Sequence, residues 1–168
     1  MDYIIRKPTS SDAEKMLEYL KIIGGETDNL TFGAEGFPIS LENEKRYLDN
    51  LLESKTSAIF VAMNGDTIIG DISFDGSSRE RLKHRGSIGL SVRRDYWHMG
   101  VGSALMEKAL DFAKNVAGAE VVVLEVRCEN ERAISLYEKY DFEITGRIPA
   151  MMKINGRFID CYTMTRFL

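Results

Sequence analysis

The sequence has no apolar run of 18 residues, and it contains only two cysteines, Cys128 and Cys161. A helix needs an apolar run of about that length to cross a bilayer, so a membrane-spanning helix is excluded. Both cysteines fall in strand-like runs, where a buried thiol is more common than a catalytic one, and they fit a reduced compartment. Nothing resembles a signal peptide, so we expect a cytoplasmic protein that has no membrane partner.

The sequence also lacks a dense run of lysine or arginine, an internal repeat and a low-complexity segment. Its formal net charge is −4, which argues against a nucleic-acid partner. The 168 residues, 44% of them hydrophobic, are enough for one sizeable core. We therefore expect a single domain over residues 1–168, as a monomer or a homodimer. The pattern assigns no metal ligands.

One stretch, residues 86–103, organises the rest of the chain. The run Ile88–Val92 predicts a buried strand, and a loop with Gly100 and Gly102 follows it. A helix is expected directly afterwards, because four apolar residues then recur at helical spacing: Val101, Leu105, Ala109 and Phe112.

A strand, a glycine loop and a helix in this order are typical of an anion site. The first backbone N–H groups of a helix have no intrahelical partner, and the helix dipole makes that end positive. Glycines let the backbone approach a phosphate closely. A tight turn without a ligand would explain the glycines equally well, since short glycine patterns are weak evidence alone.

A second stretch, residues 130–142, gives the loop a family context. Together the two stretches resemble the GNAT superfamily of N-acetyltransferases, which use acetyl-coenzyme A. The family's loop pattern, Gln/Arg-x-x-Gly-x-Gly/Ala, is matched by Gly100 and Gly102, although Trp97 stands where Gln or Arg is usual. Its second pattern, Asn-x-x-Ala-x-x-Leu-Tyr-x-x-x-Gly-Phe, is matched at all but one position, where Asp141 replaces Gly; the matching residues are Asn130, Ala133, Leu136, Tyr137 and Phe142.

The pattern along the chain predicts alternating strands and helices. Strands are expected at 3–6, 58–62, 67–75, 86–92, 120–128, 142–153 and 157–167, with two-residue turns at Asn64-Gly65 and Asn155-Gly156. Helices are expected from a capping box at Ser11 and Glu14 to the Gly24-Gly25 pair, and over 40–54, 101–115 and 130–140. The resemblance implies an α/β fold: a mixed, mostly antiparallel sheet with a central parallel βαβ unit whose two strands splay apart in a V.

The resemblance also implies a role for each motif residue. Leu90, Ser91 and Val92 would pair with the pantetheine arm of acetyl-coenzyme A, and an N–H group, that of Leu90 or Val92, would polarise the thioester carbonyl. Tyr137 would donate a proton to the leaving thiolate, although Ala133, Leu136, Tyr137 and Tyr140 also form an ordinary apolar helix face. The remaining cofactor contacts would come from the loop and the second motif: His98, Met99, Gly100, Val101, Gly102, Ser103, Asn130 and Ala133.

The acceptor amine and its base are less constrained. Ser87 occupies a position where a Glu often stands in one branch of the superfamily, which leaves His84, Glu125 or a chain of water molecules as candidate proton acceptors. The irregular stretch 24–39 is acidic and is expected to close over the acceptor. We expect Glu26, at the start of this stretch, to help bind a cationic amine; a solvated acidic loop is the alternative.

Two other functions fit parts of the sequence. A non-catalytic acyl-coenzyme A-binding module is compatible with Ser87, but the presence of Tyr137 argues against it. A dinucleotide-binding domain would need a third glycine where this chain has Leu105, and its loop would follow the first strand rather than lie mid-chain. We therefore expect an N-acetyltransferase that acts on a primary amine of a small molecule or a protein.

Overall fold

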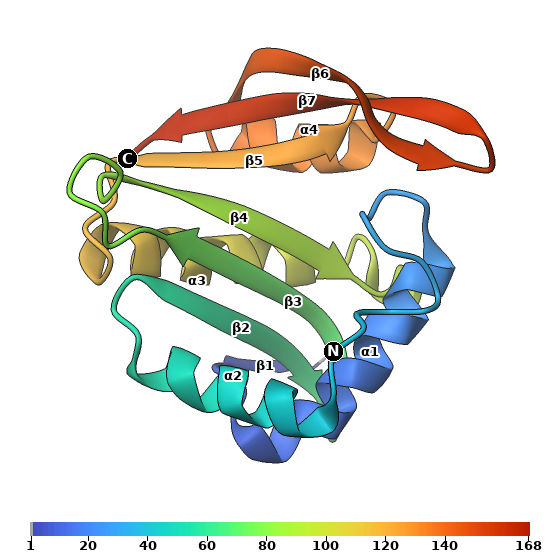
Figure 1. The fold of residues 1–168 in the computed structure, drawn as a ribbon, viewed down its shortest axis with the longest axis vertical. Coiled ribbons are helices and arrows are strands. Elements are labelled where there is room, and N and C mark those ends of the chain that lie inside the picture. Colours follow the sequence, from blue (N-terminus) through green and yellow to red (C-terminus); the bar gives the residue numbers. More distant parts are fainter. Residues whose placement is uncertain (1) are drawn as a thin grey trace.

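The computed structural model describes residues 2–168, which form one twisted seven-stranded sheet with helices on both faces (Figure 1). The strands lie in the order β1-β2-β3-β4-β5-β7-β6, and only β4 and β5 are parallel neighbours. The strands are β1 (Ile4–Arg6), β2 (Ser57–Asn64), β3 (Thr67–Gly76), β4 (Arg85–Val92), β5 (Val121–Arg127), β6 (Glu143–Ile154) and β7 (Arg157–Phe167). This confirms the predicted mixed, mostly antiparallel sheet with a central parallel pair.

Alternation along the strands divides the core between the two sheet faces. Helix α3 (Val101–Asn115) and α4 (Glu131–Lys139) cover one face, where they pack on Ile72, Phe74 and Ile88. Helix α1 (Ala13–Glu26) and α2 (Leu41–Glu53) cover the other, where they pack on a separate cluster that includes Ile59 and Val61. Successive strand residues point to opposite faces, so even-numbered residues of β4, and of β3 from Gly70 onward, face α3 and odd-numbered ones face α1. A register shift before Gly70 reverses this order, so that Ile68 packs with α1 and Ile69 with α3.

The parallel strands β4 and β5 diverge halfway along β4. Their pairing covers three positions and ends where Ser87 meets Val123. Beyond that point β4 stays paired with β3 as far as Val92, while β5 stays paired with β7 as far as Arg127. The edge of β4 that faces β5 is therefore without a strand partner over its last residues, and the expected V is present.

Helix α1 starts and ends differently from the prediction. A capping box does precede it, but it is formed by Thr9 and Asp12 around a short 3-10 turn rather than by Ser11 and Glu14. The helix also continues through the glycine pair to Glu26. The reason lies in packing, since a Cβ at Gly24 would collide with the carbonyl oxygen of Gly33.

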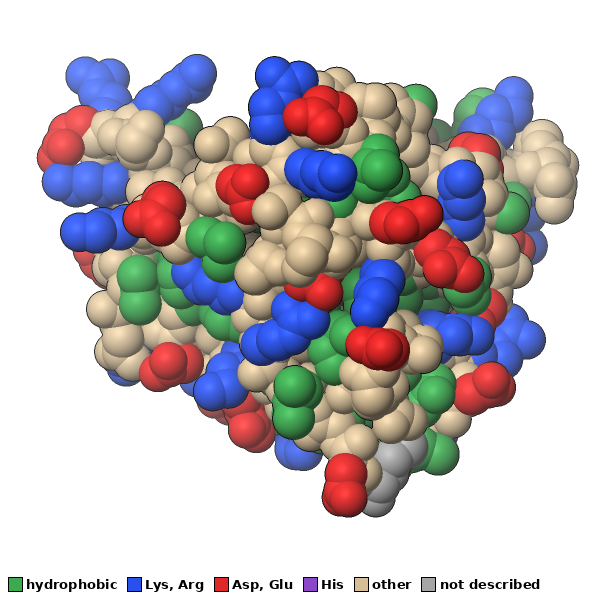
Figure 2. Space-filling view, turned by 90° about the horizontal axis from the view of Figure 1, so that it is seen from below, with side chains coloured by type: hydrophobic (Ala, Val, Ile, Leu, Met, Phe, Trp, Pro, Cys, Tyr) green, Lys and Arg blue, Asp and Glu red, His purple; other side chains and the backbone are tan. Residues whose placement is uncertain are grey.

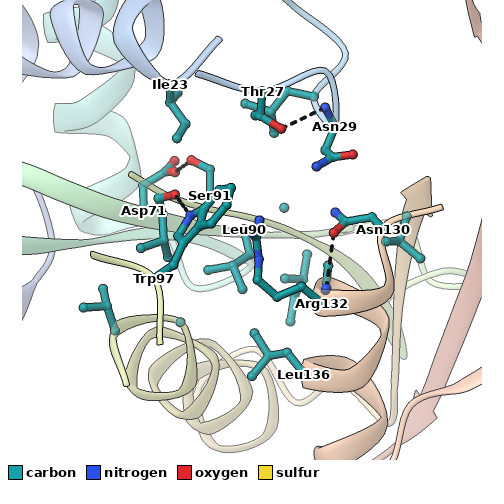
Figure 3. A pocket seen from close by; sticks show the side chains of 18 of the residues that line it. Ile23, Thr27, Asn29, Asp71, Leu90, Ser91, Trp97, Asn130, Arg132 and Leu136 are labelled. Carbon is teal, nitrogen blue, oxygen red and sulfur yellow. Dashed lines mark hydrogen bonds between the residues drawn. The ribbon is translucent and has the colours of Figure 1, made fainter. Parts of the chain in front are cut away.

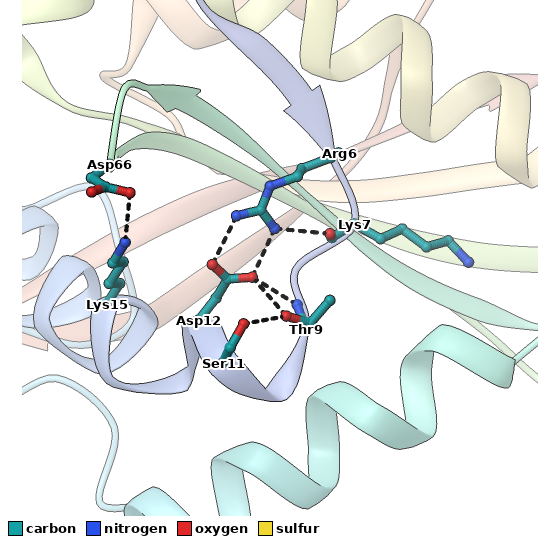
Figure 4. A network of polar contacts seen from close by, with 7 residues as sticks. All are labelled: Arg6, Lys7, Thr9, Ser11, Asp12, Lys15 and Asp66. Carbon is teal, nitrogen blue, oxygen red and sulfur yellow. Dashed lines mark hydrogen bonds and ion pairs between the residues drawn. The ribbon is translucent and has the colours of Figure 1, made fainter.

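A buried carboxylate fixes the start of α1 (Figure 4). Asp12 is 5% exposed and accepts hydrogen bonds from both guanidinium nitrogens of Arg6, at 2.7 and 2.8 Å, and from the Thr9 backbone N–H at 2.8 Å. These bonds lower the pKa of Asp12 to about 2, with the Arg6 hydrogen bond as the largest cause. The network ties β1 to the start of α1.

The remaining elements follow the predicted pattern closely. Ser40 caps α2 by accepting a hydrogen bond from the Asn43 N–H, and the Asn155-Gly156 turn has the expected positive φ angles of 49° and 81°. The first hairpin turn is shifted by one position, because Asn64 pairs with Thr67 and the loop is Gly65-Asp66. Of the helices in residues 2–168, none is long and apolar enough to span a membrane. Lysine and arginine side chains alternate with acidic ones over the face shown in Figure 2.

Candidate active site

A cavity of about 670 Å³ lies where β4 and β5 diverge. Its walls come from both sheet faces: α1 and the loop after it on one side, and the starts of α3 and α4 on the other. Figure 3 shows Ile23, Thr27 and Asp71 at one side of this space and Arg132 and Leu136 at the other. The cavity therefore passes through the opening of the sheet and connects the two sides.

The glycine loop forms one end of the cavity. Gly100 is the N-cap residue of α3 and has a φ of 81°, a left-handed conformation that favours glycine, and His98 is also left-handed with a φ of 62°. Gly102 lies close under α4, since a Cβ there would be 3.3 Å from a methyl group of Leu136. The loop thus exposes the first N–H groups of a 15-residue helix to the cavity, the arrangement expected for an anion site.

Trp97, the departure from the family loop pattern, has two partners here. Its indole Nε1 donates a 2.7 Å hydrogen bond to the carbonyl oxygen of Val92, which fixes the loop against the end of β4. The Arg132 guanidinium lies over the indole ring, 3.1 Å from its centroid (Figure 3). Partial burial, and then the nearby charge of Arg94, lower the pKa of Arg132. A cation from α4 therefore lies beside the loop, and sequence reasoning missed it.

The second motif places Tyr137 in the cavity. Asn130 caps α4 by accepting a hydrogen bond from the Ala133 N–H at 3.3 Å. One turn later Tyr137 is only 6% exposed, with its ring 6.1 Å from that of Phe142. Burial raises the pKa of Tyr137 to about 12, although the charge of Arg132 acts against that rise. Its hydroxyl has no hydrogen-bond partner within residues 2–168, so it is free to donate to a ligand.

Asp141, which replaces the glycine of the second family pattern, keeps the backbone conformation of that glycine. It has a φ of 59°, in the left-handed region that favours glycine, the residue usual in the family. Aspartate is one of the few other residues that adopt this conformation readily. The turn is therefore preserved: the N–H of Phe142 still reaches the carbonyl oxygen of Tyr137 at 3.1 Å.

The opposite side of the cavity contains an unexpected carboxylate, Asp71 of β3. It pairs across the sheet with Ser91, whose hydroxyl donates a 2.5 Å hydrogen bond to its Oδ1. Burial raises the pKa of Asp71 to about 6, while hydrogen bonds from Ser91 and Tyr19 oppose that rise. The only sequence signal is a charged residue within the apolar run Ile68–Ile72 of a predicted strand.

Most of the sequence-predicted site residues line this one cavity. From the expected cofactor contacts it includes Leu90, Ser91, Val92, His98, Gly100, Val101, Gly102, Ser103, Asn130, Ala133 and Tyr137. Met99 is not among the lining residues, and its side chain is 50% exposed. The expected contact of Met99 is through its backbone N–H, so its cofactor role stays a prediction.

The predicted acceptor residues lie in three different places. The carboxylate of Glu26 accepts hydrogen bonds from Arg93 Nε at 3.3 Å and the Arg94 N–H at 2.8 Å, and Glu26 does not line the cavity. His84 precedes β4 at its far end, about 20 Å from Leu90 at 3.3 Å per strand residue. Glu125 does line the cavity, on the same side of the sheet as Asp71. Asp71 and Glu125 are thus the acidic residues among those that line the cavity.

Comparison with known proteins gives these observations a context. The acetyltransferase (GNAT) family matches residues 27–142. Among curated relatives, the chain is 32% identical over 108 residues to the L-amino acid N-acetyltransferase AaaT of Escherichia coli, covering 64% of this chain and 66% of that protein. It is 30% identical over 105 residues to the N-alpha-acetyltransferase RimI of Mycobacterium tuberculosis, covering 62% and 63%. The match thus spans less than two thirds of these relatives.

Solved structures share the whole fold. An acetyltransferase of the GNAT family from Streptococcus pneumoniae superposes with a TM-score of 0.95 at 27% identity, over 99% of this chain and all of that one. The yncA protein from Salmonella typhimurium, whose structure includes its cofactor acetyl-CoA, superposes with a TM-score of 0.84 at 18% identity, over 100% and 95%. The second likeness concerns the fold alone.

Proposed function

Because the chain belongs to the acetyltransferase (GNAT) family, we propose that it is an N-acetyltransferase that transfers an acetyl group from acetyl-coenzyme A to a primary amine. One observation carries the proposal. The unpaired edge of β4, the glycine loop and the Tyr137 hydroxyl all border the same cavity. These are the three parts needed to hold a thioester with a pyrophosphate tail and to protonate its sulfur.

The residues present fit acetyl-coenzyme A as a cosubstrate. The N–H groups at the start of α3 would hold the pyrophosphate, and the adjacent Arg132 would add a positive charge. The free edge of β4 at Leu90 would pair with the amide groups of the pantetheine arm, as a neighbouring strand would, whereas the backbone groups of Ser91 are directed to β3. The carbonyl of Val92 already accepts the Trp97 indole N–H, so Val92 would contribute its N–H alone.

The proposed reaction is direct attack without a covalent enzyme intermediate. The acceptor amine would lie on the α1 face of the sheet, called the acceptor side below, and the thioester would lie along the free edge of β4. The cavity joins these two places through the open sheet, and such proximity can supply much of the rate. A backbone N–H at Leu90 or Val92 would stabilise the oxyanion. Tyr137, still protonated at neutral pH because burial raises its pKa to about 12, would donate its proton to the departing sulfur.

The charges on the acceptor side favour a cationic acceptor. Asp71 and Glu125 both line that side, and the one arginine among the lining residues, Arg132, belongs to α4 on the other side. An amine with a further positive charge would be attracted, whereas an acceptor carboxylate would meet two like charges. Whether the amine belongs to a small molecule or to a protein is a matter for the assay.

A thiol-release assay with acetyl-coenzyme A tests the proposal. The acceptor panel should contain amino acids, polyamines, aminoglycosides and peptides with free N-termini, and calorimetry should measure cofactor binding in parallel. We expect turnover with at least one amine and faster turnover with cationic ones. Cofactor binding without turnover on any amine would instead indicate an acyl-coenzyme A-binding module, and absence of both would overturn the site assignment.

A further inference from the structure

A chain of three hydroxyl and carboxyl groups connects α1 to the acceptor side of the cavity. The Tyr19 hydroxyl lies 2.7 Å from Ser91 Oγ, and Ser91 Oγ lies 2.5 Å from Asp71 Oδ1. The Ser91 proton is directed to Asp71, because an ionised carboxylate can only accept. Tyr19 must therefore be the donor to Ser91, so both hydrogen bonds are oriented toward the carboxylate.

The position of Asp71 also suits contact with an acceptor. Asp71 and Ser91 are paired neighbours on β3 and β4, and both line the cavity on the face covered by α1. One residue along β4, Leu90 begins the backbone edge where the thioester is proposed to lie. No lysine or arginine in the described chain forms an ion pair with Asp71, so the carboxylate has no cationic partner of its own.

We propose that Asp71 is the catalytic proton acceptor of this enzyme, held in place by Ser91 and Tyr19, which act as positioning residues. The inference rests on the proposed N-acetyltransferase function. The neutral amine attacks the thioester carbonyl carbon, a C–N bond forms, and the nitrogen becomes positively charged. Asp71 takes one proton from that nitrogen. The oxyanion electron pair then re-forms the carbonyl as the C–S bond breaks, and the sulfur takes the Tyr137 proton.

The charged and titratable groups around Asp71 explain why it is suited to this step. Tyr19 from α1 and Tyr47 from α2 face it, and the pKa of each is raised in part by the negative charge of Asp71. Asp75 lies further along its own strand, and Glu125 lies across the cavity. Burial raises the pKa of Asp71 to about 6, so the carboxylate is ionised at neutral pH yet more basic than an ordinary aspartate.

The test is the pH dependence of turnover in matched variants, measured with an amine that the parent acetylates. In the parent, the rate should fall as the pH drops below about 6, and this fall is the acidic limb of the profile. Asp71→Asn should lower kcat by about 10²-fold and remove that limb, because its amide cannot accept the proton. Asp71→Glu should restore part of the rate. Asp75→Asn, on the same strand and face but outside the cavity, should leave both rate and profile unchanged. Protonation of the acceptor amine lowers the rate equally in every variant. A difference between the pH profiles of two variants therefore reports the ionisation of Asp71.

A second variant keeps the test decisive if Asp71→Asn folds poorly. Ser91→Ala removes a hydrogen bond that lowers the pKa of Asp71, so the acidic limb should move to higher pH while calorimetric affinity for coenzyme A is retained. A purely structural role for the chain would change the melting temperature without moving this limb. Parental rate and profile in Asp71→Asn, or an unmoved limb in Ser91→Ala, would overturn the role of Asp71 and leave the acetyltransferase proposal intact. Absence of turnover in the parent protein itself would overturn both.

Discussion

The guanidinium of Arg132 stacks on the indole ring of Trp97, so that the first turn of α4 contacts the loop that precedes α3. The same indole donates to the Val92 carbonyl, which links this contact to the end of β4. In the related family pattern a Gln or Arg occupies the position of Trp97. Here the loop contributes a flat aromatic surface instead, and the positive charge comes from a different helix.

Because Arg132 supplies the positive charge beside the loop, we expect Arg132→Ala to weaken binding of coenzyme A. Loss of one desolvated cation beside a pyrophosphate should reduce affinity by about 10-fold, the equivalent of one charge-assisted hydrogen bond. Lys139→Ala is the matched control, because it removes a cation from the same helix outside the cavity. Titration calorimetry with both variants should show the loss only for Arg132→Ala, and equal affinities would exclude a phosphate contact at Arg132.

Gly100→Asp should abolish binding of coenzyme A and leave the fold intact. The substitution places a side chain and a negative charge where the pyrophosphate is proposed to lie, and Gly100 has a φ of 81°. Gly118→Asp provides the control, since Gly118 also has a positive φ, of 65°, but follows α3 at its far end, with open space where a Cβ would be. The two variants share the backbone strain and differ in the site, so unchanged affinity in a natively folded Gly100→Asp protein would refute the loop assignment.

Tyr137→Phe should lower kcat by about 10²-fold, the lower end of general acid contributions, with a change in stability of about 1 kcal/mol or less. The hydroxyl has no structural partner in the described chain, so its removal should leave packing intact. Tyr140→Phe is expected to show the opposite pattern. Its hydroxyl lies 3.1 Å from Ser103 O and 3.0 Å from Glu107 Oε1, either of which can accept its proton, and Tyr140 does not line the cavity, so stability should fall while kcat stays.

The pH profile offers a further check on Tyr137. Burial raises its pKa to about 12, so the acid form persists throughout the range in which the protein can be assayed. We therefore expect no alkaline loss of rate from this residue below about pH 11, one unit under that value. A Tyr137→Phe variant that turns over at the parental rate would make Tyr137 a packing residue, with water as the proton source.

Glu125→Gln should raise KM for a cationic amine by about 10-fold, because one of the two carboxylates on the acceptor side is lost. Affinity for coenzyme A should not change. Glu120→Gln is the control, since Glu120 precedes the same strand and lies outside the cavity. An unchanged KM in Glu125→Gln, or a preference for anionic acceptors, would contradict a cationic substrate.

Asp12→Asn should lower the free energy of unfolding at neutral pH by about 1–2 kcal/mol, allowing for the partial exposure of Arg6. The pKa of Asp12 is lowered from 3.8 to about 2, so its contribution is complete above the unfolded value and is lost as pH falls toward the folded one. Denaturant titrations should show parent and variant converging between about pH 4 and pH 2. Asp66→Asn, which removes the ion pair between Lys15 and the fully exposed Asp66, should have no measurable effect (Figure 4).

Sequence patterns predicted correctly those elements that depend on residues close together in the chain. The helical spacing after Val101 located α3 to the residue, and the Asn155-Gly156 pair located its turn. The end of α1 could not be predicted from Gly24 and Gly25, because the reason for glycine there is a loop carbonyl that packs against the helix from nine residues away. Glycine in a helix weakens it locally, yet tertiary packing decides the outcome.

The residues on the acceptor side were harder to predict from the sequence, because tertiary packing brings them together. The cofactor residues belong to two motifs, each contiguous in the chain, whereas Asp71, Ser91 and Tyr19 come from three elements: the register of β3 and β4 pairs the first two, and the packing of α1 on the sheet adds the third. Glu26 is the first acid of a stretch that reads as irregular in the sequence, but in the structure it ends α1 and pairs with Arg93. Acidic residues in a loop do not reveal from sequence alone which of them will find a basic partner.

The early end of the β4–β5 pairing also leaves a strand edge without a partner inside the sheet. An exposed strand edge normally invites a neighbouring protein to add a strand of its own, which is a common route to aggregation. Here the edge lies inside a slot bounded by α1 on one face and α4 on the other. A folded partner would have to displace one of these helices to add a strand, so the two helices protect the edge from such pairing.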